Sequence, residues 1–180
     1  MLVALALASS APASLSAFEA TLARDASATR ALENWCDARH IANPPRVTAE
    51  RLPMMTGTTP RFVRRALGLK PKQLIGSRKV RLSCGAIPLS IAWNWYDPAR
   101  LTPAMRAALE DTNTPFGKVV APLGFRRFEL ATQAGRVSPC PAGTISTHRA
   151  RLDLPGGRPL AYVIECYTEV NLKAGQTLAE

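Results

Sequence analysis

The sequence has little of what metal, nucleotide and thiol chemistry require. Its two histidines, His40 and His148, are not spaced as zinc ligands, and its four cysteines form no Cys-x-x-Cys pair. It has neither a glycine-rich phosphate loop nor a Gly-x-Ser-x-Gly nucleophile elbow. We therefore expect no metal and no cofactor, and the arrangement of cysteines and histidines does not favour a thiol protease.

Acidic residues are also scarce. The 180-residue chain has 13 Asp and Glu against 23 Lys and Arg, which gives a formal charge of +10. Such a balance is typical of proteins that bind nucleic acid or anionic membranes, and it also serves solubility. The basic residues are spread along the chain and are densest between Arg61 and Arg81. Because no helix-turn-helix, zinc-finger or ribonucleoprotein motif accompanies them, we expect no nucleic-acid partner.

The N-terminal apolar run, residues 2–8, is too short to cross a bilayer, and we expect no membrane insertion. An Ala-Pro-Ala sequence at 11–13 fits the small-x-small rule for signal cleavage. Residues 1–13 therefore favour a signal peptide and a periplasmic or secreted protein, although no Lys or Arg precedes Arg24. The alternative is an apolar helix on a cytoplasmic protein.

Length and composition predict one domain with a real core, since 47% of the 180 residues are apolar. We expect this domain to be a monomer. Export would permit disulfides, and Cys36 and Cys84 could then join an N-terminal helix to the first core strand. The alternative interpretation of both residues is a buried free thiol.

The stretch at 77–98 reads as two strands and the turn between them. Side chains alternate across a strand, so Arg78 shares a face with Val80, Leu82 and Cys84. An arginine at the head of an apolar row either lies at a strand end and reaches water, or meets an anion inside a pocket.

The stretch at 160–168 alternates as a second strand. Glu165 shares one face with Val163 and Tyr167, and the opposite face is also largely apolar, which favours a central strand. A carboxylate there needs a partner or a raised pKa. Together, Arg78 and Glu165 suggest a pocket with one fixed cation and one acid that exchanges a proton.

The remaining segments predict an α+β fold. Helical spacing from Phe18 to His40, with Ser27 or Asp25 as a cap, indicates N-terminal helices. Thr59 is the expected N-cap of a short helix, and Thr102 caps another. Strands at 47–52, 125–131 and 147–154 complete an antiparallel sheet with helices packed on one side. The expected organisation is a helical segment over 14–45, an α+β domain over 46–172 and a polar tail over 173–180.

These landmarks, in this order, resemble the chorismate lyase family, whose members remove pyruvate from chorismate to leave 4-hydroxybenzoate. The ligand-sensing domains of a class of bacterial transcription regulators look like the same fold. The resemblance covers about residues 47–172. Its landmarks are Arg78, the strand LSIAWNWYDPARL, the Thr-Pro-Phe-Gly-Lys turn at 114–118, the hairpin THRARLDLPGGRPL and Glu165.

The resemblance implies roles for particular residues. The family's arginine at the place of Arg78 clamps a ligand carboxylate, and its glutamate at the place of Glu165 meets the ring oxygen. The residue matching Phe116 lies at the pocket wall, and a family glycine beside the pocket corresponds to Ala92. The family's Ser-Met-Thr segment corresponds to Thr58-Thr59-Pro60, which makes Thr59 a candidate ligand contact.

Two functions follow from these assignments. The first is a chorismate–pyruvate lyase without metal or cofactor, in which Arg78 holds the substrate and Glu165 serves as acid and base. The second is a non-catalytic module that binds an aromatic or other small carboxylate in the same pocket. A basic surface for an anionic polymer or a membrane is a third and weaker hypothesis.

Overall fold

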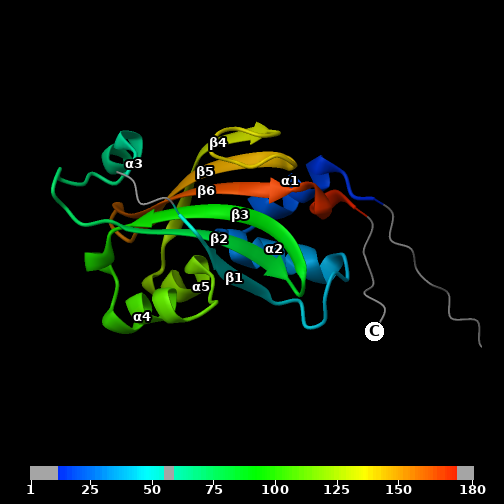
Figure 1. Ribbon diagram of the computed structural model, residues 1–180, viewed down its shortest axis with the longest axis horizontal. Coiled ribbons are helices and arrows are strands. Elements are labelled where there is room, and N and C mark those ends of the chain that lie inside the picture. Colours follow the sequence, from blue (N-terminus) through cyan, green and yellow to red (C-terminus); the bar gives the residue numbers. More distant parts are fainter. Residues whose placement is uncertain (1–11, 55–58, 174–180) are drawn as a thin grey trace, which may run out of the picture.

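The computed structural model describes residues 12–54 and 59–173, and within them it contains one antiparallel sheet of six strands (Figure 1). Their order across the sheet is β1-β2-β3-β6-β5-β4. The strands are β1 (Val47–Leu52), β2 (Gly76–Cys84), β3 (Ile87–Tyr96), β4 (Arg126–Ala134), β5 (Thr144–Leu154) and β6 (Arg158–Thr168). The expected antiparallel α+β fold is confirmed. Most of the proposed signal peptide and polar tail lies outside the described residues.

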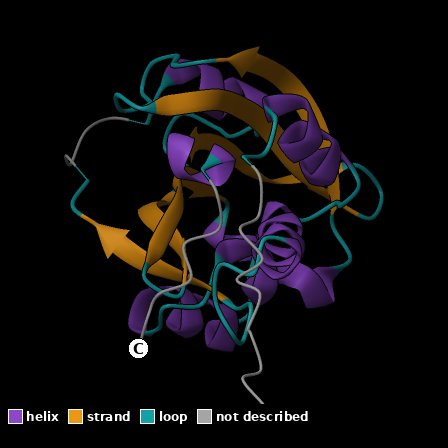
Figure 2. Cartoon of the chain, turned by 90° about the vertical axis from the view of Figure 1, so that its right-hand side faces the viewer, coloured by secondary structure: helices purple, strands orange, loops and turns teal. Residues whose placement is uncertain are grey.

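Five α-helices accompany the sheet in the described residues. They are α1 (Leu15–Ala23), α2 (Ala28–Ala38), α3 (Arg61–Ala66), α4 (Pro103–Asp111) and α5 (Phe116–Val120), with short 3-10 turns at Pro98–Arg100, Ala121–Leu123 and Glu169–Leu172. In Figure 1, α1 and α2 lie at one end of the sheet, and α4 and α5 lie at the other. Figure 2 shows how the sheet curves around helices.

The sheet has an inner face covered by α1, α2, α4 and α5. Phe18 and Leu32 from the first pair of helices pack with Val80 of β2, while Leu109 and Val120 from the second pair pack in a separate apolar cluster. Two clusters at opposite ends of one face leave the middle of that face to other side chains. The polar residues described below lie there.

The outer face of the sheet is covered in part by α3, which departs from the expectation that all helices pack on one side. Val63 and Leu67, four residues apart, are buried against Trp95 and Tyr162. Residues at i and i+4 lie on the same side of a helix, so this short element presents one apolar edge. The aromatic residues of β3 and β6 therefore find cover on the outer face.

Helix starts follow the capping rules with one correction. The side chain of Ser27 accepts a hydrogen bond from Arg30 N at 3.5 Å, and that of Thr102 accepts one from Met105 N at 3.2 Å. The prediction of Thr59 as the cap of α3 is wrong by one residue. Pro60 takes the cap position, and no side chain there makes a capping hydrogen bond.

All four cysteines are paired. Cys36–Cys84 joins α2 to β2 on the inner face with Cα atoms 6.3 Å apart, which is the pair named from the sequence. Cys140–Cys166 joins the loop before β5 to β6, with Cα atoms 5.5 Å apart, and was not anticipated. Among the described residues, no helix is long and apolar enough to cross a membrane.

Candidate functional site

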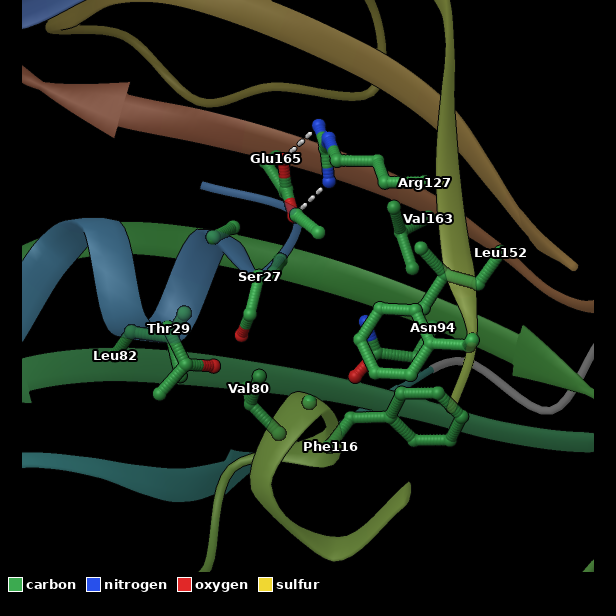
Figure 3. Close-up of a pocket in the computed structure, with 15 residues that line it drawn as sticks. Ser27, Thr29, Val80, Leu82, Asn94, Phe116, Arg127, Leu152, Val163 and Glu165 are labelled. Atoms are coloured by element: carbon green, nitrogen blue, oxygen red, sulfur yellow. Dashed lines mark hydrogen bonds and ion pairs between the residues drawn. The ribbon is translucent and has the colours of Figure 1, made fainter. Parts of the chain in front are cut away.

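A small cavity lies in the middle of the inner face, between the sheet and the first residues of α2 and α5 (Figure 3). Its volume of about 40 Å³ holds about two or three water molecules. Val80, Ala92 and Val163 form its floor, and Phe116 and Phe125 form apolar walls. Its polar lining consists of Ser27, Thr29, Asn94, Arg127 and Glu165.

Sheet register explains why these side chains meet. Ala92 of β3 lies opposite both Val80 of β2 and Glu165 of β6. In the next inward-facing row, Asn94 lies opposite both Arg78 and Val163. The inward alternation predicted for both strands is therefore correct, and Arg78 and Glu165 do face the same side of the sheet.

Glu165 is paired with an arginine that the sequence interpretation missed. Arg127 Nη1 donates to Glu165 Oε1 at 3.1 Å, and Arg127 Nη2 donates to Oε2 at 2.8 Å. The Tyr167 hydroxyl donates to the same Oε2 at 3.0 Å. A bidentate guanidinium–carboxylate pair of this kind is among the stronger hydrogen-bonded contacts in proteins.

This pairing corrects the role expected for Glu165. Burial alone would raise the pKa of its carboxyl, but the charge and hydrogen bonds of Arg127 outweigh burial and hold that pKa below its usual value. Glu165 is therefore ionised at neutral pH and carries no proton to donate. Of the two alternatives expected for this carboxylate, a partner or a raised pKa, the structure has the partner, Arg127 of β4.

The ion pair between Arg127 and Glu165 belongs to a wider polar network on the inner face of the sheet. Burial raises the pKa of the Tyr167 hydroxyl, and the neighbouring Glu165 carboxylate raises it further. His148 Nε2 lies 2.8 Å from Glu19 Oε2 of α1, and Arg127 Nη2 lies 3.2 Å from Glu129 Oε2. A second hollow of about 620 Å³ lies beyond Arg127, which lines both. No group of three or more metal-binding side chains occurs in the described part of the chain.

Arg78 is buried without a matching carboxylate. Its side chain is only 2% exposed, and its one hydrogen bond runs from Nη1 to the Thr114 carbonyl at 3.5 Å. Its Nε and Nη2 are buried without a hydrogen-bond partner among the described residues. Burial lowers the pKa of its guanidinium, and the like charge of Arg51 lowers it further.

The position of Arg78 differs from that of the other predicted residues. Glu165, Ala92 and Phe116 line the cavity, whereas Arg78 lies one strand beyond Asn94 and is not part of its lining. Phe116 also stacks at a tilt on Tyr96, with ring centroids 5.3 Å apart. The structure therefore brings three of the five predicted residues to one cavity, places Arg78 behind its wall and leaves Thr59 outside it.

Asn94 is a cavity residue that the sequence interpretation did not single out. It is 6% exposed, and no hydrogen bond to its amide is present in the described structure. In Figure 3 this amide points toward the hydroxyls of Ser27 and Thr29. An amide that borders the cavity in this way is open to a hydrogen bond from a molecule that enters it.

The start of α2 lines the cavity at the place expected for Thr59. Thr59 precedes α3 and does not line the cavity, whereas Ser27, Ala28 and Thr29 do. The first amides of an 11-residue helix have no partner within it, and they favour negative charge.

The comparisons with solved structures define the fold. No family model matches the chain. The ligand-binding domain of a protein described as a GntR-family transcriptional regulator from Bordetella bronchiseptica aligns with a TM-score of 0.55 and 19% identity, over 74% of this chain and 92% of that one. The effector domain of PhnF from Mycobacterium smegmatis aligns with a TM-score of 0.60 and 11% identity, over 81% and 90%. The chain has the fold of these ligand-sensing domains.

A sequence relative defines the family more narrowly. The uncharacterized protein y4mC from Sinorhizobium fredii (strain NBRC 101917 / NGR234) is 34% identical over 174 aligned residues. The alignment covers 86% of this chain and 73% of the relative. The chain belongs to the same family as y4mC.

Proposed function

We propose that this protein is a non-catalytic module that binds a small carboxylate, aromatic or otherwise, at the inner face of its sheet. The observation that carries the proposal is Arg78, a buried cation with two unpaired donors. A buried charge is costly unless it is compensated, so a persistent one favours a ligand that supplies the opposite charge. The ligand-binding domains with the same fold support a small-molecule site.

The polar groups around the cavity suit a carboxylate. A guanidinium can donate two parallel hydrogen bonds to it, and the Asn94 amide can donate another. The first amides of α2, with the hydroxyls of Ser27 and Thr29, add donors and a favourable dipole. A ligand larger than the present cavity needs one of its apolar walls, Phe116 or Phe125, to move.

The chemistry favours binding over elimination. A lyase of the chorismate type needs a proton donor for the departing enolpyruvyl oxygen. Glu165 is the acid nearest the cavity, and Arg127 holds it ionised with both oxygens occupied. We therefore place turnover of chorismate second to simple binding, and we assign Glu165 to the pocket wall.

The test is calorimetric titration with benzoate, 4-hydroxybenzoate and pyruvate, using 4-hydroxybenzamide as the neutral counterpart. We expect saturable binding of at least one carboxylate and none of the amide. Arg78→Met should weaken binding by about 2–5 kcal/mol, because the carboxylate loses its charge-assisted bonds. Lys79→Met is the matched control, since the neighbouring side chain points to the outer face.

Two results would contradict this function. Equal affinity for the acid and the amide would show that charge is not recognised. Equal effects of Arg78→Met and Lys79→Met would remove Arg78 from the site. Incubation with chorismate decides the second candidate: release of 4-hydroxybenzoate at a rate lost in Glu165→Gln would replace the binding module with the lyase.

We further infer export, because all four cysteines are paired and lasting disulfides form in oxidising compartments. The loops closed by the two bonds span 48 and 26 residues of sequence separation. In the chain-entropy account, each bond stabilises the fold by about 3–4 kcal/mol. When the protein is taken from its own cells and alkylated rapidly, no thiol should react. The isolated chain should also lack its first residues. Four alkylated thiols would contradict export.

A further inference from the structure

The connection between β1 and β2 has an unusual charge distribution. This connection spans residues 53–75, which contain no Asp or Glu and five Lys or Arg. Within this stretch, α3 and the loop after it extend beyond the edge of the sheet, at the left of Figure 1. We call the exposed side chains here the basic projection: Arg61, Phe62, Arg65, Lys70, Lys72 and Leu74.

The basic projection is an ordered part of the fold. Arg64 Nη1 donates to the carbonyls of Lys70 and Gln73 at 3.0 and 3.2 Å, which ties the loop back to α3. Gln73 Nε2 donates to Asp97 Oδ2 at 3.1 Å, which ties it to the end of β3. The charged and apolar side chains of the projection are therefore presented on a braced segment.

Two apolar side chains stand among these cations. Leu74 is 80% exposed, directly after the braced turn, and Phe62 is 49% exposed on α3. Phe62 packs partly on Tyr162, with ring centroids 5.5 Å apart, while Leu74 stays open to solvent. An exposed apolar tip with a basic surround matches the two requirements of an anionic bilayer, headgroup charge and a hydrocarbon boundary.

We propose that the basic projection docks this protein on the surface of an anionic phospholipid bilayer. Lys70 and Lys72 meet the headgroups, and Leu74 enters the boundary between headgroups and acyl chains. A nucleic acid satisfies the cations equally well, but it gives an aliphatic side chain such as Leu74 nothing to stack on. The inference does not depend on the ligand of the inner cavity, which lies on the other face of the sheet.

The test is co-sedimentation of the full chain with vesicles of phosphatidylcholine alone or with 30% phosphatidylglycerol. Binding should require phosphatidylglycerol and should weaken as salt rises. Lys70→Glu/Lys72→Glu should reduce binding at least about 25-fold, since each cation near the surface contributes about fivefold. Leu74→Ser should reduce it about tenfold by removing the apolar contact.

Arg24→Glu/Arg46→Glu is the matched control, because it changes the net charge equally at two exposed sites away from the projection. It should retain most of the binding. Equal loss in both double variants would reduce the effect to overall charge and overturn the proposal. So would equal binding to neutral vesicles, or no binding by the unaltered chain. Tighter binding to single-stranded oligonucleotide, unchanged in Leu74→Ser, would reassign the surface to nucleic acid.

Discussion

Two arginines lie on the inner face of the same sheet, Arg78 buried and Arg127 half-buried, and they differ in what surrounds them. Arg127 meets Glu165 through two hydrogen bonds of 3.1 and 2.8 Å, and it also approaches Glu129. Arg78 has one hydrogen bond of 3.5 Å to a carbonyl and no carboxylate among its described contacts. The pKa of the Arg127 guanidinium is raised because Glu165 outweighs burial, whereas that of Arg78 is lowered.

The comparison separates a cation that is paired in the described structure from one that is not. The protein supplies the counter-charge for Arg127, so that charge contributes to the folded state with no ligand. Residues 12–54 and 59–173 supply none for Arg78, so folding without a ligand is opposed by the buried charge. The cavity lies between the two arginines, and we infer that its ligand supplies a counter-charge to Arg78 only.

The largest effect on stability should come from Arg127, the arginine whose charge is compensated. Arg127→Ala leaves Glu165 buried without a counter-charge, and we expect the free energy of unfolding to fall by about 3–5 kcal/mol. Urea denaturation followed by circular dichroism measures this. Arg126→Ala is the control, because its exposed neighbouring side chain should change stability by less than about 0.5 kcal/mol.

Removing both charges sharpens the same point. In Arg127→Met/Glu165→Gln, neither group remains charged, and we expect most of the lost stability to return. A double variant as unstable as Arg127→Ala would indicate that the packing of Arg127, and not its pairing with Glu165, stabilises this end.

A smaller effect should appear at Asn94. If its amide donates to the ligand carboxylate, Asn94→Leu should weaken binding of the carboxylate about tenfold, because one hydrogen bond to a charged group is lost. Asn94→Asp keeps the size of the side chain but opposes the ligand charge, and it should weaken binding further. Calorimetric titration measures both affinities. If Asn94→Leu and Asn94→Asp bound the carboxylate equally well, Asn94 would be removed from the site.

The smallest effect concerns pH. The folded-state pKa of Glu165 is lowered, so its contribution to stability is fully present above the unfolded value of about 4.3 and is lost as pH falls through the folded value. As the pH falls below 5, the free energy of unfolding of the unaltered protein should therefore decrease more than that of Glu165→Gln. The difference between the two decreases should be on the order of 1 kcal/mol or more. Parallel stability curves for the two proteins would contradict an ionised, paired Glu165.

Local patterns predicted much of the fold. Alternation placed Arg78 and Glu165 on the inward face of their strands, and the caps at Ser27 and Thr102 mark the starts of two helices. Both features depend on residues near in sequence. The helix at α3 was also expected, but its packing on the outer face depends on aromatic residues about 30 and 100 positions away.

The partners in the site could not be predicted in the same way. Arg126 and Arg127 are adjacent basic residues in a strand. Arg127 lies opposite Leu152 and not in the row of Glu165, so its long side chain reaches Glu165 along the inner face. The segment at the start of α2 reaches the cavity because two distant helices converge there. Such contacts follow from tertiary packing, which single-sequence patterns do not encode.

The central claim is that the buried charge of Arg78 is compensated by the anionic group of a ligand and not by the fold. The most direct measurement is the free energy of unfolding of ligand-free Arg78→Met beside that of the unaltered protein. The account predicts that the variant is as stable as the unaltered protein or more stable, by up to about 4 kcal/mol, because an uncompensated charge is replaced by an apolar chain. A loss of stability comparable to that of Arg127→Ala would show that the fold itself compensates Arg78, and would contradict the account.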